Sequence, residues 1–493
     1  MSLVPVPATI LVVGSGAREH AICWRLRRDE GVRRVIEAPG NAGHADVADA
    51  RPDIAAGDIA AIVALARREA VDLVVVGPEA PLVAGVVDRL AAAGIPAFGP
   101  SAAAAAVEGS KALCRRIAGR AGVPMARGAR FDAVAPALAY AAALGGGVVV
   151  KADGLAAGKG VTVCATLEEA ENALRDAIEG RVFGDAGREV VVEQALTGRE
   201  ASVIAICDTT TALALPAARD HKRIGEGDTG PNTGGMGAYS PLPDLDDDAV
   251  ADILRRFHVP TLAALAARGR PFRGALYAGL MLTDAGARLL EDNVRLGDPE
   301  AQAILPRVAV PLAPLLLAAA TDRLAAVAEA LGIAGSVLPA TPGATVGVVL
   351  ATDGYPASPV VGDPIDGLEA ARASGALVFE GGTRRAGGVT VTAGGRVLTV
   401  VAGGDDLARA ASAAHAAASC VTFRGRQVRG DIGRGAGSLI ASSGPEDSAV
   451  AGSQVDGTAG LPSPLDVAAA TSSSGVSSSG SDVAGSWPAE ARP

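Results

Sequence analysis

Residues 151–160 read Lys-Ala-Asp-Gly-Leu-Ala-Ala-Gly-Lys-Gly and follow an apolar run, 148–150, that is typical of the end of a strand. The stretch holds two of the four lysines among the 44 basic residues of the chain, and all the others are arginine. Lysine offers a compact, strongly hydrated ammonium that suits phosphate binding, and glycines let the backbone come close to a ligand. The stretch therefore predicts a loop that covers the phosphates of a nucleotide. The alternative is that the lysines cluster by chance.

Size and composition narrow the class of protein. With 493 residues, 49% hydrophobic and only 3% aromatic, the chain is long enough for about three α/β domains whose cores consist of Ala, Val and Leu. Its net charge of -10 argues against a general binder of nucleic acid or membrane surfaces. The five cysteines lack paired spacing and are expected to be buried apolar residues rather than zinc ligands. Because the chain shows no signal-peptide pattern and no membrane-spanning apolar run, we expect a cytoplasmic enzyme.

The N-terminal hundred or so residues alternate strands and helices. The runs 8–13 and 71–76 are typical of buried strands, which predicts a parallel sheet with helices between its strands. Gly14-Ser-Gly-Ala-Arg-Glu19 begins like a dinucleotide-binding turn but has Glu19 in place of the third glycine, and Glu37 stands where an acid could bind a ribose. A nicotinamide dinucleotide thus remains an alternative to a simple phosphate, which would bind the free N–H groups of the turn with help from Arg18.

The central part of the chain carries other signals. A helix is predicted to open near Lys111, and 189–193 and 199–206 are typical of strands. The segment 220–237 contains six glycines and is predicted as a long functional loop. Strands are also predicted at 276–283 and 288–293, paired with each other.

Polar residues at the ends of these strands indicate phosphoryl transfer. Alternation along a strand places Glu291 and Asn293 on one face, where their oxygens could hold one or two magnesium ions against phosphate. Asp292 then points to the opposite face. Arg295 lies on the metal side, where it could pair with a carboxylate or a transferring phosphoryl group. Glu193 ends a strand and is placed to read an adenine edge with its backbone and carboxylate, and Glu200 is available for a ribose hydroxyl.

The C-terminal part returns to short strands, such as 345–350 and 396–401, with a helix at 407–418. This pattern is typical of a smaller α+β unit. Residues 437–493 are rich in Ser, Gly and Ala and poor in large apolar groups, so they are predicted to form a disordered tail that cannot offset its ordering entropy. The alternative is an ordered element near 461–470.

Several motifs together resemble one family of enzymes. They are Gly14-Ser-Gly-Ala-Arg-Glu-His-Ala21, Ala38-Pro-Gly-Asn-Ala-Gly43, Val76-Gly-Pro-Glu-Ala-Pro-Leu82, the stretch 151–160, Asp220-His-Lys-Arg223, Asp228-Thr-Gly-Pro-Asn-Thr-Gly-Gly-Met-Gly-Ala-Tyr-Ser240 and Asn293-Val-Arg-Leu-Gly-Asp-Pro-Glu300. From about residue 8 to about residue 435, the chain resembles the phosphoribosylamine-glycine ligases, also called glycinamide ribonucleotide synthetases, of the ATP-grasp superfamily.

The resemblance implies a multidomain fold of α/β and α+β units. We expect a Rossmann-like N-terminal domain at 1–108, an ATP-grasp domain at 109–330 with a lid subdomain at about 127–192, a C-terminal α+β domain at 331–436 and the disordered tail at 437–493. The implied reaction is ATP-dependent ligation of glycine to 5-phosphoribosylamine through glycyl phosphate, which gives glycinamide ribonucleotide, ADP and phosphate in de novo purine biosynthesis. The implied cofactors are ATP and Mg2+, with Mn2+ as a substitute. We expect a monomer that binds these small molecules and neither nucleic acid nor membranes.

The resemblance also assigns roles residue by residue. ATP is expected against Lys111, Lys151, Lys159, Glu193 and Glu200, and the metal on Glu291 and Asn293. The catalytic residues around glycine and the reacting phosphate are expected to be Asp220, Lys222 and Arg295. The phosphoribosylamine is expected to contact Gly14, Gly16, Arg18, Glu19, Gly77, Pro78, Glu79 and Asp298.

The chain departs from the family pattern at Asp292, where the family has a large apolar side chain. A buried, unpaired carboxylate is costly, so Asp292 is expected to be exposed, paired or protonated. His20 is consistent with either packing or substrate contact. Two other classes stay open. An ATP-grasp carboxylase or a ligase for another amine would share the ATP site, and a binding protein without catalysis should have lost a lysine or a metal ligand.

Overall fold

The computed structural model describes residues 4–155 and 160–434. Lys159 and the segment 437–493, for which a phosphate contact and a disordered tail are predicted, lie outside the described residues. The described residues belong to one compact unit. None of their helices combines the length and the apolar character needed to cross a membrane.

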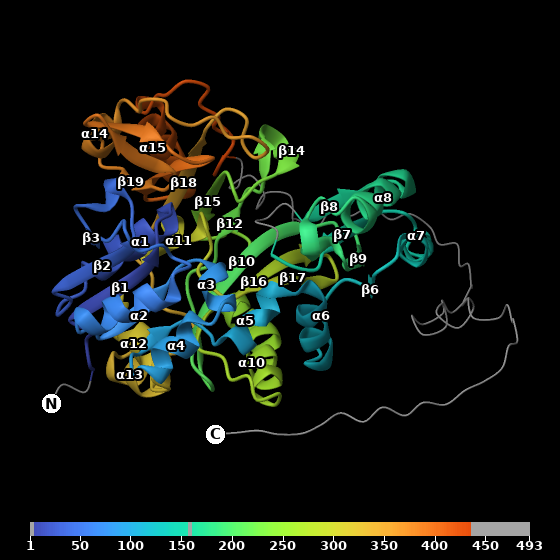
Figure 1. Cartoon of the computed structure of the whole chain (residues 1–493), viewed down its shortest axis with the longest axis horizontal. Coiled ribbons are helices and arrows are strands. Elements are labelled where there is room, and N and C mark those ends of the chain that lie inside the picture. The colour runs from blue at the N-terminus through green and yellow to red at the C-terminus, as the bar shows by residue number, and fades with distance from the viewer. Residues whose placement is uncertain (1–3, 156–159, 435–493) are drawn as a thin grey trace, which may run out of the picture. The chain divides into compact units, whose positions relative to one another are not determined.

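The N-terminal part is a parallel sheet with helices between its strands (Figure 1). Its strands, in the order β3-β2-β1-β4-β5, are β1 (Thr9–Gly14), β2 (Arg34–Pro39), β3 (Asp49–Ala50), β4 (Leu73–Val76) and β5 (Ala97–Phe98). Its helices are α1 (Ala17–Leu26), α2 (Ile59–Arg68), α3 (Glu79–Val83), α4 (Val86–Ala92) and α5 (Ala102–Gly109). The predicted alternation is confirmed. Strand order reverses between β1 and β4, so the turns at Gly14 and Gly77 meet at the carboxyl edge where such sheets bind ligands.

The central part contains two antiparallel sheets. The first has the order β6-β9-β7-β8 and consists of β6 (Gly128–Phe131), β7 (Val148–Ala152), β8 (Val161–Cys164) and β9 (Val190–Gln194), with α7 (Val134–Ala143) and α8 (Leu167–Leu174) packed against it. The second has the order β11-β10-β16-β17 and consists of β10 (Arg199–Cys207), β11 (Ala212–Ala214), β16 (Gly274–Thr283) and β17 (Gly286–Asn293). Near it lie α6 (Lys111–Arg120), α9 (Asp247–Ile253) and α10 (Val259–Ala266).

The predicted pair of strands at 276–293 is confirmed, but the pairing contains a bulge. Gly279 lies opposite Glu291, whereas Leu280 lies opposite Leu289, so Leu290 is the extra residue of β17. A bulge bends a strand and changes the direction of its side chains, and bulges are frequent beside active sites. The strand that carries the predicted metal ligands is therefore irregular just before them.

The last large sheet joins two parts of the chain. Its order is β12-β15-β18-β22-β19, with β12 (Arg219–Asp220), β15 (Gly237–Ser240), β18 (Ala344–Ala351), β19 (Leu377–Glu380) and β22 (Arg396–Gly404). In Figure 1 the green β15 runs beside the orange-brown β18, in agreement with their antiparallel pairing. The prediction of one long loop at 220–237 was wrong, because this segment holds β12 and a hairpin of β13 (Arg223–Gly225) and β14 (Thr229–Asn232).

Further helices and strands complete the described fold. They are α11 (Glu300–Ile304), α12 (Ala313–Ala320), α13 (Leu324–Ala330), α14 (Leu368–Ala373), β20 (Thr383–Ala386), β21 (Val389–Thr392) and α15 (Leu407–Cys420), with single turns of 3-10 or π helix between them and the larger elements. The cysteines Cys23, Cys114, Cys164 and Cys207 are buried as expected. The expectation was wrong for Cys420, which is exposed.

Candidate active site

Glu291, near the end of β17, is the carboxylate at which lysines converge. Burial by itself would raise its pKa, but the charges of Lys111, Lys222 and Lys151, with a hydrogen bond from Asn293, outweigh burial and lower the pKa to about 2. The three lysines come from the start of α6, the segment after β12, and β7. They are all the lysines that the described residues contain.

Glu291 and Asn293 lie together on one side of β17, as predicted. Asn293 Nδ2 donates a hydrogen bond to Glu291 Oε1 across 3.3 Å. An ionised carboxylate and an amide oxygen are hard ligands of the kind that Mg2+ prefers. Within 4–155 and 160–434, no three His, Cys, Asp or Glu side chains form a group that could hold a metal ion. The chemistry of Glu291 and Asn293 fits such an ion.

Lys151 is fixed by two partners. Its Nζ lies 2.6 Å from Glu193 Oε2 and donates to the carbonyl of Leu290, the bulged residue, across 2.7 Å. The Glu193 carboxylate also binds Arg115 Nη1 at 2.9 Å. Arg115 was not predicted, because an arginine within a helix carries no motif. Since Glu193 neutralises two cations, the adenine contact predicted for its carboxylate would compete with both.

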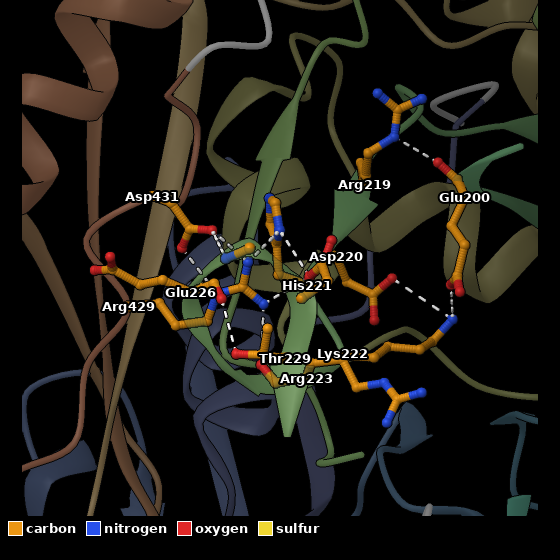
Figure 2. Close-up of polar contacts among 12 residues, drawn as sticks. Glu200, Arg219, Asp220, His221, Lys222, Arg223, Glu226, Thr229, Arg429 and Asp431 are labelled. Atoms are coloured by element: carbon orange, nitrogen blue, oxygen red, sulfur yellow. Dashed lines mark hydrogen bonds and ion pairs between the residues drawn. The ribbon is translucent and has the colours of Figure 1, made fainter. Parts of the chain in front are cut away.

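Lys222 lies between two carboxylates (Figure 2). Its Nζ is 3.7 Å from Asp220 Oδ1 and forms a closer ion pair with Glu200. Burial raises the pKa of Asp220; Lys222 opposes this shift, and Glu300 and Glu200 add to it. Burial would lower the pKa of Lys222, but the charges of Asp220 and Glu200 raise it well above its usual value. Glu200, predicted for a ribose hydroxyl, is thus engaged by Lys222.

Arg295 connects the end of β17 to the N-terminal sheet. Its Nε is 3.6 Å from Glu79 Oε2, and its Nη2 is 3.3 Å from Glu108 Oε1. Glu108, near the end of α5, also accepts the N–H of Val294 across 2.6 Å. Burial would lower the pKa of Arg295, but Glu108, Glu79 and Glu300 outweigh burial and raise it. Sequence reasoning missed Glu108, because an acid at a helix end has no signature of its own.

Glu19 fills the glycine turn after β1. Its Oε2 accepts the N–H of Gly16 at 2.7 Å, and its Oε1 accepts Arg18 Nε at 2.7 Å. A Cβ at Gly77 would lie 2.0 Å from Glu19 Oε1, and one at Gly14 would lie 2.5 Å from Glu19 Cγ. A side chain at either position would displace Glu19, and Gly14 in addition has a φ of +133°, which favours glycine. This corrects the sequence analysis, since the Gly16 N–H that we expected to be free for a phosphate is already bonded.

Asp298 links this region to the C-terminal sheet. Its Oδ2 is 2.8 Å from Arg396 Nη2, and its Oδ1 accepts Gln302 Nε2 at 2.7 Å. Burial would raise the pKa of Asp298, but Arg396, Arg18 and the Gln302 hydrogen bond lower it. Arg396, on β22, was not predicted. Pro78 immediately precedes α3, so it places Glu79 in the first turn of that helix.

Three open questions from the sequence have structural answers. Glu37 is fully buried, with its Oε2 2.7 Å from His44 Nδ1, so the acid required by the dinucleotide alternative is engaged inside the protein.

His20 is also buried and accepts the N–H of Glu380 at 3.0 Å, which favours packing over substrate contact. Asp292 is buried, its Oδ2 lies 3.7 Å from Cys114 Sγ, and burial raises its pKa to about 7. Exposure of Asp292 is thus excluded.

Known proteins resemble this chain over most of its length. Three family profiles match consecutive parts: phosphoribosylglycinamide synthetase N domain at 8–108, the ATP-grasp (A) domain at 109–301 and the C domain at 345–435. A phosphoribosylamine-glycine ligase of Xanthomonas campestris pv. campestris is 48% identical over 427 residues, which cover 86% of this chain and 97% of that protein. One from Vibrio vulnificus is 45% identical over 426 residues, with the same coverage.

Solved structures agree. The crystal structure of phosphoribosylamine-glycine ligase from Thermotoga maritima matches with a TM-score of 0.72 and 31% identity, and covers 86% of this chain and 99% of that one. The biotin carboxylase domain of 2-oxoglutarate carboxylase from Hydrogenobacter thermophilus matches with a TM-score of 0.63 at 17% identity over 86% of this chain and 92% of that one, a likeness of fold alone. The chain therefore belongs to the phosphoribosylglycinamide synthetase family of ATP-grasp enzymes, the family of the phosphoribosylamine-glycine ligases.

Proposed function

We propose that the residues around Glu291 and Arg295 join glycine to 5-phosphoribosylamine through a glycyl phosphate intermediate. The overall reaction is that of the family, the ATP-dependent ligation of these two substrates in purine biosynthesis. One observation carries the proposal, namely the convergence of Lys111, Lys151 and Lys222 on Glu291. Clustered cations beside an ionised hard ligand are what a transferring phosphoryl group requires.

The ATP side of the site is proposed as follows. Lys111 and Lys151, with Lys159 from the glycine-rich stretch, neutralise the phosphates, and Glu193 and Glu200 lie toward the nucleoside. Glu291 and Asn293 hold Mg2+, for which Mn2+ can substitute. A metal ion held there would supply positive charge that stabilises the negative charge of the transferring phosphoryl group.

The glycine side uses Lys222, Arg295 and Asp220. A carboxylate is a poor electrophile, so the carboxylate of glycine first attacks the γ-phosphorus of ATP and ADP leaves. Lys222 and Arg295 pair with the negative charge of this carboxylate. The amine of phosphoribosylamine then attacks the acyl carbon and phosphate leaves. The attacking amine must lose a proton. Asp220 is the proposed acceptor. Its pKa is raised to about 7, so the ionised carboxylate is a stronger base than an ordinary one.

The phosphoribosylamine is proposed to bind at the carboxyl edge of the parallel sheet. The proposed contacts are Gly14, Gly16, Arg18, Glu19, Gly77, Pro78, Glu79 and Asp298. Arg18 Nη1 donates to the carbonyl of Leu296 at 3.2 Å, so this edge adjoins the segment that follows Asn293. We also propose the domain limits 1–108, 109–330 and 331–436, with a lid at about 127–192, and a monomer in solution.

The decisive experiment measures ADP formation with ATP, Mg2+, glycine and freshly formed phosphoribosylamine, and omits each in turn. Turnover is expected only in the complete mixture. Hydroxylamine in place of phosphoribosylamine should trap glycyl phosphate as glycyl hydroxamate, which tests the intermediate separately. Bicarbonate is the control for a carboxylase. Equal turnover with bicarbonate, or with another amino acid replacing glycine, would refute the proposal.

A further inference from the structure

Arg429 lies in the C-terminal segment after α15, outside every motif assigned to the reaction. It is an almost fully buried arginine, with 1% of its surface exposed. A buried guanidinium needs a full set of acceptors, since an unpaired charge is costly inside a protein. The acceptors of Arg429 therefore show what holds it in place.

One acceptor is Asp431, two residues further along. Arg429 Nε donates to Asp431 Oδ1 at 2.8 Å and Nη2 donates to Oδ2 at 2.6 Å. This two-pronged pairing fixes the plane of the guanidinium. Asp431 Oδ2 also accepts the N–H of Gly227 at 2.9 Å. Asp431 thus both orients Arg429 and binds the turn of the β13–β14 hairpin.

The other side of Arg429 faces that hairpin (Figure 2). Nη1 donates to Asp228 Oδ1 at 2.7 Å and to the carbonyl of Arg223 at 3.0 Å. Nη2 lies 3.2 Å from His221 Nδ1. His221 and Arg223 are the two neighbours of Lys222 in the chain. Arg429 therefore contacts both chain neighbours of the proposed catalytic lysine, the side chain of His221 and the backbone carbonyl of Arg223.

The hairpin has few other contacts that fix it. None of the residues 223–232 is buried. Ile224 packs against the small cluster of Met236, Val349 and Ala351, and Asn232 Nδ2 donates to the carbonyl of Val161 at 3.3 Å. Lys222 is also held through its own backbone, because its carbonyl accepts the N–H of Thr233 at 2.7 Å. The contacts of Arg429 hold the hairpin to the C-terminal segment. The N–H of Gly430 adds a further contact, because it donates to Glu226 Oε1 at 2.7 Å.

We propose that Arg429 is a positioning residue, which holds the His221 side chain and the Arg223 carbonyl so that the Lys222 ammonium stays between Asp220 and Glu200 and close to Glu291. This inference rests on the proposed function of Lys222. It adds that a residue of the C-terminal segment, 206 positions from Arg223, supports a site whose proposed substrate, metal and catalytic contacts come from residues 14–298.

The test compares Arg429→Met with Arg426→Met. Arg426 lies on the same segment but donates to the carbonyls of Ala418 and Val421. Loss of charged hydrogen bonds predicts a rise of about 10- to 100-fold in the KM for glycine in Arg429→Met, with the KM for ATP nearly unchanged. Arg429→Lys keeps the charge but loses the two-pronged pairing with Asp431. Its KM for glycine should therefore lie between those of Arg429→Met and wild type. A normal KM for glycine in Arg429→Met would overturn the proposal.

Trypsin provides a readout that does not depend on activity. If Arg429 holds the carbonyl of Arg223, cleavage after Arg223, followed by mass spectrometry, should be faster in folded Arg429→Met than in wild type or Arg426→Met. Equal cleavage rates would contradict the proposal that Arg429 holds this carbonyl in place.

Lys222→Met distinguishes failure of the proposed function of Lys222 from failure of the positioning role of Arg429. Wild-type turnover in Lys222→Met would refute the proposed function of Lys222. A defective Lys222→Met beside a normal Arg429→Met would refute the positioning role alone. If positioning is right, adding Arg429→Met to Lys222→Met should cause little further loss, because the group that Arg429 positions is already gone.

Discussion

Replacing Glu108 by Gln removes one negative charge from beside Arg295 and changes little else. The Gln oxygen can still accept the Val294 N–H, which Glu108 Oε2 accepts at 2.6 Å. The Gln amide group would then stand where Glu108 Oε1 lies 3.3 Å from Arg295 Nη2, and an amide N–H cannot accept from a guanidinium. The substitution therefore tests whether Glu108 orients Arg295 for the reaction.

The expected loss follows from the interaction removed. Removing the charge that lies 3.3 Å from Arg295 Nη2 is expected to cost about 1.5 to 3 kcal/mol, the range for polar contacts of charged groups, and about 1.4 kcal/mol is a factor of ten. We expect kcat/KM for glycine to fall about 10- to 150-fold. Stability should change much less. Burial raises the pKa of Glu108 even though Arg295 lowers it, so the buried carboxylate is itself costly. Glu79 would still compensate Arg295.

The assay is initial velocity against glycine at saturating ATP and phosphoribosylamine, with thermal melting of the same samples. The matched control is Glu30→Gln, which removes the charge of an exposed acid. Wild-type kcat/KM in a folded Glu108→Gln variant would refute the reasoning. A large drop of the melting midpoint together with activity would also refute it, because Glu108 would then act through the fold rather than through Arg295.

Three further predictions concern pH and metal. Burial lowers the pKa of His258 to about 4, so the neutral ring stabilises the fold above the unfolded pKa of about 6.5 and this contribution, about 3 kcal/mol, is lost as the pH falls toward 4. In urea unfolding between pH 7 and 4, His258→Gln should lose less stability than wild type by about that amount; parallel losses would contradict this. Glu200→Gln should lower the pKa of Asp220 and move the acid limb of the pH–rate profile to lower pH, and an unmoved limb would count against Asp220 as the titrating group. Alanine at Glu291 or Asn293 should reduce turnover about 10- to 100-fold in a magnesium titration, and wild-type kinetics in both variants would place the metal elsewhere.

Local signals in the sequence predicted much of the fold correctly. The strands around 9–14, 73–76 and 274–293 follow from apolar runs and alternation, which report burial on one or both faces over a few residues. The segment 220–237 was misjudged as a loop because its glycines hide short strands. Those strands form by pairing with each other and, in β15, with β18 more than a hundred positions away.

The predicted site residues came from motifs, and their partners did not. Arg115, Glu108, Arg396 and Arg429 lie in helices, strands or a terminal segment without any motif, yet each binds a residue that carries one. Glu19 shows the converse. Its motif was recognised, but its close approach to Gly77 depends on two strand ends meeting at one edge of the sheet.

The sequence by itself determined the family, the order of strands and helices and the identity of the motif residues, because periodicity and short motifs are properties of neighbouring residues. Only the tertiary structure decided which charges meet. The low pKa of Glu291 depends on lysines from three separate segments, and the carbonyl of Arg223, next to Lys222, binds an arginine 206 positions further along. Electrostatic energy depends on distance in space and on burial, and neither is encoded in the spacing of residues along the chain.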